Sequence, residues 1–260
     1  METITGANLY DFPKYYDLIF GSDWKAELQF LRAVFEKHAR RRVHRVFEPA
    51  CGTGRLLYRL GKAGYSVSGI DLNERAVEYC NRRLARHGLP PSAGVRDMTN
   101  FRLPRKVDAA FNMINSFRHL ASERAARSHL ECIARALAKG GVYVLGLHLT
   151  PTRGDPTEEE EWSARRGNLT VISQLRTVDR DLRRRNEAVH MSFGIYTPSR
   201  TFRLTGRADF RTYTARQIQS LFRKVPSLSV AATYDFAYRP DLPVAVGPNT
   251  EDVVYVLVKG

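Results

Sequence analysis

Two small residues, Gly52 and Gly54, stand where a buried strand should turn into a helix. They lie in the stretch VFEPACGTGRLL, residues 46–57, between an apolar run and leucines with helical spacing. Because glycine has no side chain, the main chain there can approach a ligand closely and adopt φ values that other residues resist. Asp71 ends a second apolar run about 20 residues downstream, where a carboxylate accepts hydrogen bonds from ribose hydroxyls. Together these residues predict a site for a nucleoside-bearing cofactor.

The residues around this turn favour one kind of cofactor over another. A dinucleotide-binding turn carries a third glycine, which lets the helix pack closely while its N-terminus faces a pyrophosphate. This chain has Leu57 at that position, and Glu48 places a carboxylate just before the turn, where it would repel a pyrophosphate. A cofactor with positive charge and no phosphate fits better, and S-adenosylmethionine, with its sulfonium and ammonium groups, is such a molecule. A nicotinamide oxidoreductase is the disfavoured alternative.

Alternating strands and helices must hold these residues in place. Residues 23–39 carry apolar side chains at helical spacing, and five strand–helix alternations follow up to residue 150. Helices of crossover length between strands imply a parallel sheet with helices on both faces. We expect the helix before the fifth strand to stop at Gly140-Gly141. The five strands are expected within RVHRVFEPA, YSVSGIDL, SAGVRDM, VDAAFNMI and VYVLGLHL.

The pattern changes after residue 150. Residues 151–166 are polar and contain proline and glycine, which predicts a loop or linker. Three segments with strand character follow and predict an antiparallel piece inserted into, or laid across, the main domain. A helix with Thr214 as its expected N-cap and two final strands close the chain.

With these elements placed, the chain resembles the class I S-adenosylmethionine-dependent methyltransferases. FEPACGTGRLL resembles their motif I, GIDLN their motif II, RDM their third-strand acidic motif and NMINSFRHL their motif IV. ALAKGGVYVL resembles their helix–Gly-Gly–strand segment, and FRTYTARQIQSLF the start of their last crossover helix. Upstream, YYDLIF resembles an element that closes over the cofactor in several small-molecule methyltransferases.

The resemblance implies an α/β fold. Its main part is a Rossmann-like, doubly wound, mostly parallel seven-stranded sheet with an inserted antiparallel β piece. The expected parts are an S-adenosylmethionine-binding core with N-terminal lid helices at 1–150, inserted strands that cover the acceptor pocket at 151–212, and the last helix and two strands at 213–260.

The resemblance also implies a set of cofactor contacts, of which Asp71 would hold the ribose and Leu72 would pack on the adenine. Structural alternatives stay open: Leu72 and Met98 could be core residues, Asp97 could cap a turn, and Asp71 could also cap a helix. The remaining contacts are Glu48, Ala50, Cys51, Gly52 and Gly54 at the methionine part, Asp97 and Met98 at the adenine edge, Asn112 and Ile114 beside the transferred methyl, and Tyr15 and Tyr16 over the sulfonium.

Methyl transfer from a sulfonium is an in-line displacement with a good leaving group. The protein must chiefly align the nucleophile with the methyl and exclude water, so neither a metal nor a catalytic triad is required. A hydroxyl nucleophile usually needs a base, and an amine must be neutral. His119, His148 and Tyr16 are the catalytic candidates; for either histidine a structural hydrogen bond is the competing explanation.

The sequence lacks one motif, and its absence narrows the range of possible methyl acceptors. Methyltransferases of exocyclic base amines and of glutamine carry N/D-P-P-Y/F after the fourth strand, whereas this chain has NMINSF. The inserted strands resemble the extra sheet of small-molecule N-methyltransferases. We therefore expect a small-molecule acceptor, with nitrogen favoured slightly over oxygen.

The formal net charge of +14 supports an alternative acceptor, RNA. That alternative predicts that Arg165, Arg166 and residues 183–185 cluster beside the cofactor site. A third hypothesis is a non-catalytic partner protein that retains the fold. Three separate cysteines and the absence of a long apolar run predict a cytoplasmic protein without disulfides, a cysteine zinc site or a membrane segment. Nothing in the sequence indicates an oligomeric state.

Overall fold

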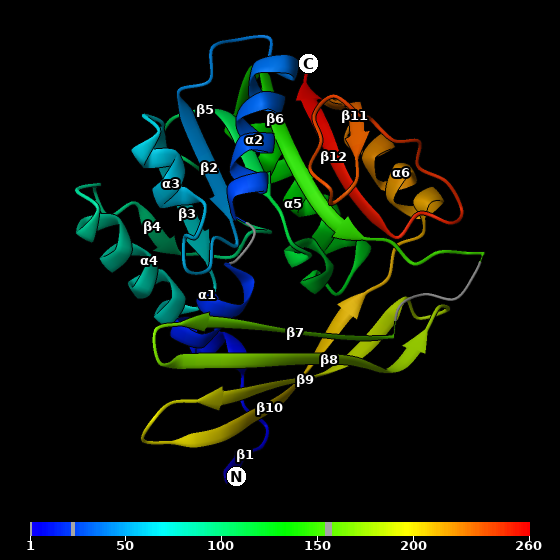
Figure 1. Ribbon diagram of the computed structural model, residues 1–260. Coiled ribbons are helices and arrows are strands. Elements are labelled where there is room, and N and C mark those ends of the chain that lie inside the picture. Colours follow the sequence, from blue (N-terminus) through cyan, green and yellow to red (C-terminus); the bar gives the residue numbers. More distant parts are fainter. Residues whose placement is uncertain (1, 22–23, 154–157) are drawn as a thin grey trace.

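Two β-sheets form the framework of the computed structural model, which describes residues 2–21, 24–153 and 158–260 (Figure 1). The larger sheet has seven strands in the order β11-β12-β6-β5-β2-β3-β4, and only β12 runs antiparallel to its neighbours. This confirms the expected Rossmann-like, mostly parallel sheet. Its strands are β2 (Arg45–Pro49), β3 (Ser66–Asp71), β4 (Ala93–Val95), β5 (Val107–Asn112), β6 (Leu137–His148), β11 (Leu228–Tyr234) and β12 (Asp252–Lys259).

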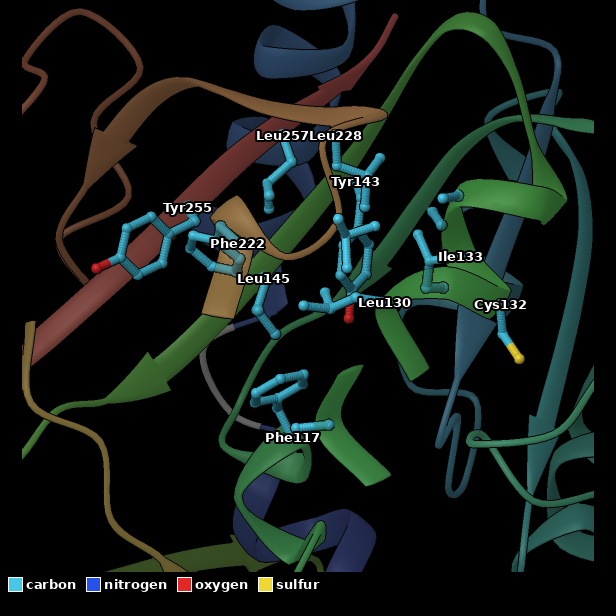
Figure 2. Packing of buried hydrophobic residues seen from close by; sticks show 14 of the residues in the cluster. Phe117, Leu130, Cys132, Ile133, Tyr143, Leu145, Phe222, Leu228, Tyr255 and Leu257 are labelled. Atoms are coloured by element: carbon cyan, nitrogen blue, oxygen red, sulfur yellow. The ribbon is translucent and has the colours of Figure 1, made fainter. Parts of the chain in front are cut away.

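Helices cover both faces of the large sheet because its strands are apolar on both sides. One face packs against α2 (Trp24–His38), α3 (Leu57–Lys62) and α4 (Glu74–Arg86). The other packs against α5 (Glu123–Ala136) and α6 (Ala215–Arg223). Figure 2 shows part of this second layer, in which Phe222 of α6 lies against Tyr255 of β12, with ring centroids 4.9 Å apart.

The smaller sheet has five strands in the order β1-β10-β9-β8-β7. Its four later strands are antiparallel, as expected for the inserted piece, while β1 pairs with β10 in parallel. Two short helices, η1 (Leu9–Asp11) and α1 (Pro13–Phe20), connect β1 to the rest of the chain. The strands are β1 (Glu2–Ile4), β7 (Glu159–Arg166), β8 (Leu169–Asp181), β9 (Asn186–Tyr196) and β10 (Thr201–Arg211).

Two local predictions were wrong. Residues 159–166 form β7 rather than a loop, because a polar, glutamate-rich segment can pair with β8 as a solvent-exposed edge strand. The helix before β6 ends at Ala136 and not at Gly140-Gly141, because Leu137 already has extended φ and ψ. The two glycines lie inside β6, where a Cβ on Gly141 would come within 2.8 Å of the Asp108 carbonyl oxygen.

The last helix follows its sequence signal closely. The Thr214 hydroxyl accepts from the Gln217 main-chain N–H at 3.3 Å, and the Gln217 side chain accepts from the Thr214 N–H at 3.0 Å. This reciprocal pair is a capping box, which satisfies two otherwise unpaired donors. None of the helices in the described part of the chain is long and apolar enough to cross a membrane.

Candidate active site

A cavity of about 530 Å³ lies between the two sheets. Its residues come from the carboxyl ends of β2, β3, β5 and β6 on one side and from β7, β8, β9 and β10 on the other. In Figure 1 the smaller sheet passes below the ends of the parallel strands. Open α/β sheets bind their ligands at this edge, and small-molecule pockets have roughly 300–1,000 Å³.

The turn after β2 has three residues with left-handed main-chain conformations: Ala50, Gly52 and Gly54, with φ of 52°, 50° and 66°. A Cβ on Gly52 would meet no atom within 4 Å, and Gly52 lines the cavity. A Cβ on Gly54 would lie 2.3 Å from the Cys80 sulfur of α4, and Gly54 is not part of the cavity wall. Gly52 therefore leaves room for a ligand, whereas Gly54 leaves room for α4.

Asp71 at the end of β3 fixes this turn. Its Oδ2 accepts a hydrogen bond from the Gly52 N–H at 2.8 Å, and its Oδ1 accepts one from the Asn73 N–H at 2.8 Å. The side chain that caps α4 is Asn73, which accepts from the Ala76 N–H at 3.0 Å, so Asp71 is not the N-cap. Each carboxylate oxygen has a second lone pair. Asp71 thus lines the cavity with acceptor capacity left for hydroxyl donors.

Two buried acceptors in the cavity wall lack partners. Neither Glu48 Oε2 nor Asn112 Oδ1 has a hydrogen-bond partner among the described residues. The Asn112 amide is oriented by its Nδ2, which donates to the Pro49 carbonyl at 2.7 Å. Burial raises the pKa of Glu48 well above its ordinary value, although Arg55 acts in the opposite direction. Buried acceptors are rarely left unpaired, so these two atoms indicate a ligand with N–H donors.

The positive charge of Arg55 acts on Glu48 and lowers its pKa, and Arg55 is itself paired with a second carboxylate. Its guanidinium forms a two-pronged ion pair with Glu27 of α2, with Nη2 and Oε1 2.9 Å apart. The Tyr238 hydroxyl donates to the same Oε1 at 3.2 Å. The cluster holds two carboxylates and one guanidinium, so it can accept one positive charge from a ligand.

The histidine candidate His119 faces the cavity beside two tyrosines. Its Nε2 lies 2.8 Å from the Tyr10 hydroxyl, and the Tyr10 and Tyr16 ring centroids are 5.2 Å apart. Although the His119 side chain is accessible from the cavity, loss of solvation lowers its pKa to about 4, and the charge of Arg118 lowers it further. Burial raises the pKa of Tyr16 to about 12. At neutral pH the site therefore presents a neutral imidazole and protonated phenols.

His148, the other histidine candidate, lies at the end of β6. Its Nδ1 is 2.5 Å from Asp252 Oδ1 on β12, and its main-chain N–H donates to Asn115 Oδ1 at 2.8 Å. The ring also makes an edge contact with Phe236 at 5.1 Å. His148 lines the cavity, but the carboxylate of Asp252 already engages its Nδ1.

The remaining predicted residues divide into two groups. Tyr15 packs against Phe12 and Phe202 outside the cavity wall. Asp97 also lies outside it, exposed, and accepts from the Thr99 N–H at 2.7 Å as a turn cap. Leu72, 69% exposed, forms an uncovered apolar surface at the cavity, which a packed core residue would not. Ala50, Cys51, Met98 and Ile114 line the cavity.

The inserted strands supply the opposite wall. Leu175, Val189 and Met191 form an apolar surface there. The buried Glu187 beyond them pairs with Arg118 and with Arg180, whose Nε lies 2.8 Å from Glu187 Oε1. This wall thus combines an apolar area with a charged, hydrogen-bonded end.

Sequence reasoning missed Tyr10, Arg55 and Asn73, and most of the inserted-strand wall. The period-2 pattern of EAVHMSFGIY could have identified the inward-facing positions of β9. No local pattern could have placed Tyr10 against His119, because 109 residues separate them.

Comparison with known proteins gives a family match over the middle of the chain. Residues 46–141 match the family model described as "Methyltransferase domain". A dTDP-3-amino-3,4,6-trideoxy-alpha-D-glucopyranose N,N-dimethyltransferase of Streptomyces venezuelae is 29% identical over 140 residues, 52% of this chain and 56% of the relative. A tRNA (guanine(10)-N2)-dimethyltransferase of Methanothermobacter thermautotrophicus is 33% identical over 104 residues, 38% of this chain and 31% of the relative. The aligned stretches thus span from just under a third to just over half of these relatives.

Solved structures match nearly the whole chain. Streptomyces venezuelae DesVI superposes with a TM-score of 0.79 at 20% identity, covering 96% of this chain and 98% of that one. CalS10 from Micromonospora echinaspora, an amino pentose methyltransferase with bound SAM, superposes with a TM-score of 0.73 at 18% identity, covering 96% of both chains. At such identities the likeness concerns the fold.

Proposed function

The chain belongs to the class I S-adenosylmethionine-dependent methyltransferases, and on this premise we propose that it transfers a methyl group from S-adenosylmethionine to a small-molecule amine. One observation carries the proposal. The main chain at Gly52 faces a cavity whose wall holds the Asp71 carboxylate, which has acceptor capacity left. The same wall holds two buried acceptors, on Glu48 and Asn112, that have no partner among the described residues.

The cavity residues fit the chemical groups of this methyl donor. Glu48 and Asn112 offer acceptors for an ammonium group, and Asp71 offers acceptors for a ribose diol, with hydrogen bonds to charged groups contributing about 1.5–3 kcal/mol each. Leu72 and Met98 offer apolar surface for an adenine. When bound, the donor supplies an activated methyl on a sulfonium, so no residue of this chain has to activate the leaving group.

The protein's own task is alignment and exclusion of water. Orientation of the reacting groups can lower a barrier by roughly 7–11 kcal/mol. Tyr16 and Tyr10 stay protonated and close the cavity on the side of α1 and η1. Their rings also offer negative faces to a cation. His119, a neutral imidazole held by the Tyr10 hydroxyl at 2.8 Å, is placed to orient an amine acceptor.

The weak basicity of His119, one of the two histidine candidates, favours nitrogen over oxygen. A hydroxyl acceptor needs a base with a pKa near the working pH. His119, with its pKa lowered to about 4, is too weak a base for that task, whereas a neutral amine needs no base before it attacks. Amino sugars are the acceptor class we propose to test first, because the curated relative from Streptomyces venezuelae is named for one.

The RNA alternative has less support. Its predicted arginine cluster would need Arg165 and Arg166 beside residues 183–185. The first pair lies next to the start of β8 and the second group just after its end, so 13 residues of strand separate them, about 40 Å. The non-catalytic alternative predicts cofactor binding without turnover, or a blocked acceptor cavity. The 530 Å³ space between the sheets speaks against the blocked cavity, and an assay of turnover tests the other form.

The decisive experiment combines binding with turnover. Calorimetry with S-adenosylhomocysteine should give one site per chain in the wild type and strongly reduced affinity in Asp71→Ala. Incubation with labelled methyl donor and a panel of amino sugars, simple amines, sugar hydroxyls and RNA should place the label on an amine. Labelling of RNA alone would refute the acceptor class, and wild-type protein that binds no S-adenosylhomocysteine would refute the function.

A further inference from the structure

A second hollow, of about 330 Å³, lies behind the glycine turn and is lined by four arginines. Arg59 comes from α3, Arg83 and Arg86 from α4, and Arg166 from the end of β7. In Figure 1 the end of β7 lies on the same side of the molecule as α1 and α4. We call it the arginine hollow. It shares no described lining residue with the cavity between the sheets.

The arginine hollow carries more positive charge than its residues neutralise. Asp17 is the one carboxylate among its described lining residues. Asp17 is buried and divides its oxygens among Arg83, the Thr53 hydroxyl at 2.9 Å and Arg166 at 3.5 Å. Within the described residues no ion pair is made by Arg59 or Arg86. The hollow therefore keeps unneutralised guanidinium groups.

Aromatic rings hold two of the four guanidinium groups in position, those of Arg59 and Arg83. Arg59 lies 4.0 Å from the Trp24 ring centroid and 4.4 Å from that of Tyr58, and Arg83 lies 5.1 Å from the centroids of Tyr58 and Tyr79. Stacking covers the flat face of a guanidinium and leaves its N–H groups at the edge. The Arg59 Nε is buried and has no acceptor among the described residues. Such fixed forks match the oxygens of a phosphate group.

Residues next to the hollow add positive charge, and the surrounding cations help to lower the pKa of His87. An adjoining depression shares Arg86 and Arg166 with the hollow and adds Lys14 and Arg82, of which Arg82 is paired with Glu78. Loss of solvation lowers the pKa of His87. The charge of Lys62, outside the hollow, lowers it further, as do those of three of the hollow's arginines, Arg83, Arg86 and Arg59. Cations crowded in this way repel one another, which an anion would relieve.

We propose that the arginine hollow binds the phosphate or pyrophosphate group of a small molecule. Its wall is polar, aromatic stacking fixes two of its four guanidinium groups, and its volume is larger than one phosphate but small for a drug-sized ligand. A small molecule suits it better than RNA, because the other arginine group, at residues 183–185, lies at the far end of β8. The proposal is independent of the function assigned to the other cavity.

Calorimetry with inorganic pyrophosphate, at constant low ionic strength and without methyl donor, tests the proposal. We expect one site per chain. Arg86→Gln combined with Arg166→Gln should weaken binding at least about tenfold, since the loss of one charge-assisted hydrogen bond alone has roughly that effect. The matched control removes two exposed charges elsewhere, by Arg176→Gln and Arg223→Gln, and should bind like the wild type.

A second measurement reports on the site itself. Bound pyrophosphate should raise the pKa of His87 in an NMR titration of the wild type, because an anion favours the imidazolium. No pyrophosphate binding, equal weakening in the control variant, or an unchanged pKa of His87 would overturn the proposal. So would single-stranded RNA that binds more tightly with increasing length and loses affinity in the Arg86/Arg166 variant, because the hollow would then serve a nucleic acid.

Discussion

Glu48→Gln should raise the thermal stability of the free protein and weaken its binding of a cationic ligand. Glu48 is 7% exposed, its Oε2 has no partner among the described residues, and burial raises its pKa well above 4.5. Glutamine keeps the shape of the side chain and removes the charge, so ionisation in the buried site no longer has a cost. Each unit of pKa shift corresponds to about 1.4 kcal/mol between the two protonation states.

The pH dependence of the stability that Glu48 contributes follows from the number of protons bound in the folded and unfolded states. Since the pKa of Glu48 is higher in the folded than in the unfolded protein, the folded protein binds more protons above pH 4.5. The stability that this group contributes is therefore complete below 4.5 and is lost as pH rises through the folded pKa. The Tm of the Gln variant, relative to wild type, should be lowest at acid pH and increase towards neutral pH.

The same substitution should weaken ligand binding, although it stabilises the free protein. Loss of one charge-assisted hydrogen bond costs about 1.5–3 kcal/mol, so the variant should bind S-adenosylhomocysteine, which keeps the ammonium group, roughly 10- to 150-fold more weakly. Wild-type binding should release a proton and tighten with pH, because the ammonium favours ionised Glu48. Calorimetry in two buffers of different ionisation enthalpy measures that release.

Thermal unfolding across about pH 5 to 9 and calorimetry at each pH complete the test. Glu36→Gln, at an exposed position of α2, is the matched control and should change neither quantity. A Tm difference between the Glu48 variant and wild type that does not vary with pH would refute the burial argument. Equal affinity of wild type and variant for the ligand would refute the ammonium contact.

Gly52→Val should reduce ligand affinity by about a hundredfold or more, because its side chain would fill open cavity space; normal affinity in calorimetry would contradict this. Gly54→Ala should instead lower the free energy of unfolding by about 1–3 kcal/mol through contact with Cys80, and Cys80→Ala should restore part of it in denaturant titrations. Asp71→Ala should lower both ligand affinity and, by about 1–3 kcal/mol, stability, because the Gly52 N–H loses its acceptor; unchanged stability would show that water replaces the carboxylate. His119→Asn should lower kcat without removing a titration near pH 6.5 from the rate profile, since the pKa of His119 is about 4.

The main sheet could be predicted because its signals are local. A period of 3.6 identifies α4, which is stabilised by burial of the apolar face that the period marks. A continuous apolar run identifies β6, which is buried on both faces of the sheet. Asp71 could be predicted for the same reason, since the end of a parallel strand fixes where its side chain lies. The structure adds what the pattern leaves out: Asp71 also accepts from the Gly52 N–H and so shapes the turn.

The predictions from sequence fail where contacts between segments distant in the sequence determine the structure. The run of glutamates in β7 has no strand pattern of its own, and its extended form depends on pairing with β8. The same holds for the wall formed by Val189 and Met191, whose position against the cavity depends on how the whole smaller sheet docks. Propensity summed over a short window contains no information about such docking.

The N-terminal segment explains how the two sheets form one site. β1 pairs with β10 of the smaller sheet, while the Asp11 carboxylate accepts from Asn73 Nδ2 at 2.6 Å and Asp17 accepts from the Thr53 hydroxyl. The segment therefore joins the inserted strands to the turn and helix that border the cavity. The unpaired acceptors in that cavity cost stability in the free protein, and the contacts of the N-terminal segment offset part of this cost. A ligand that satisfies the acceptors should stabilise the folded chain further, by an amount that grows with the logarithm of its concentration divided by its Kd.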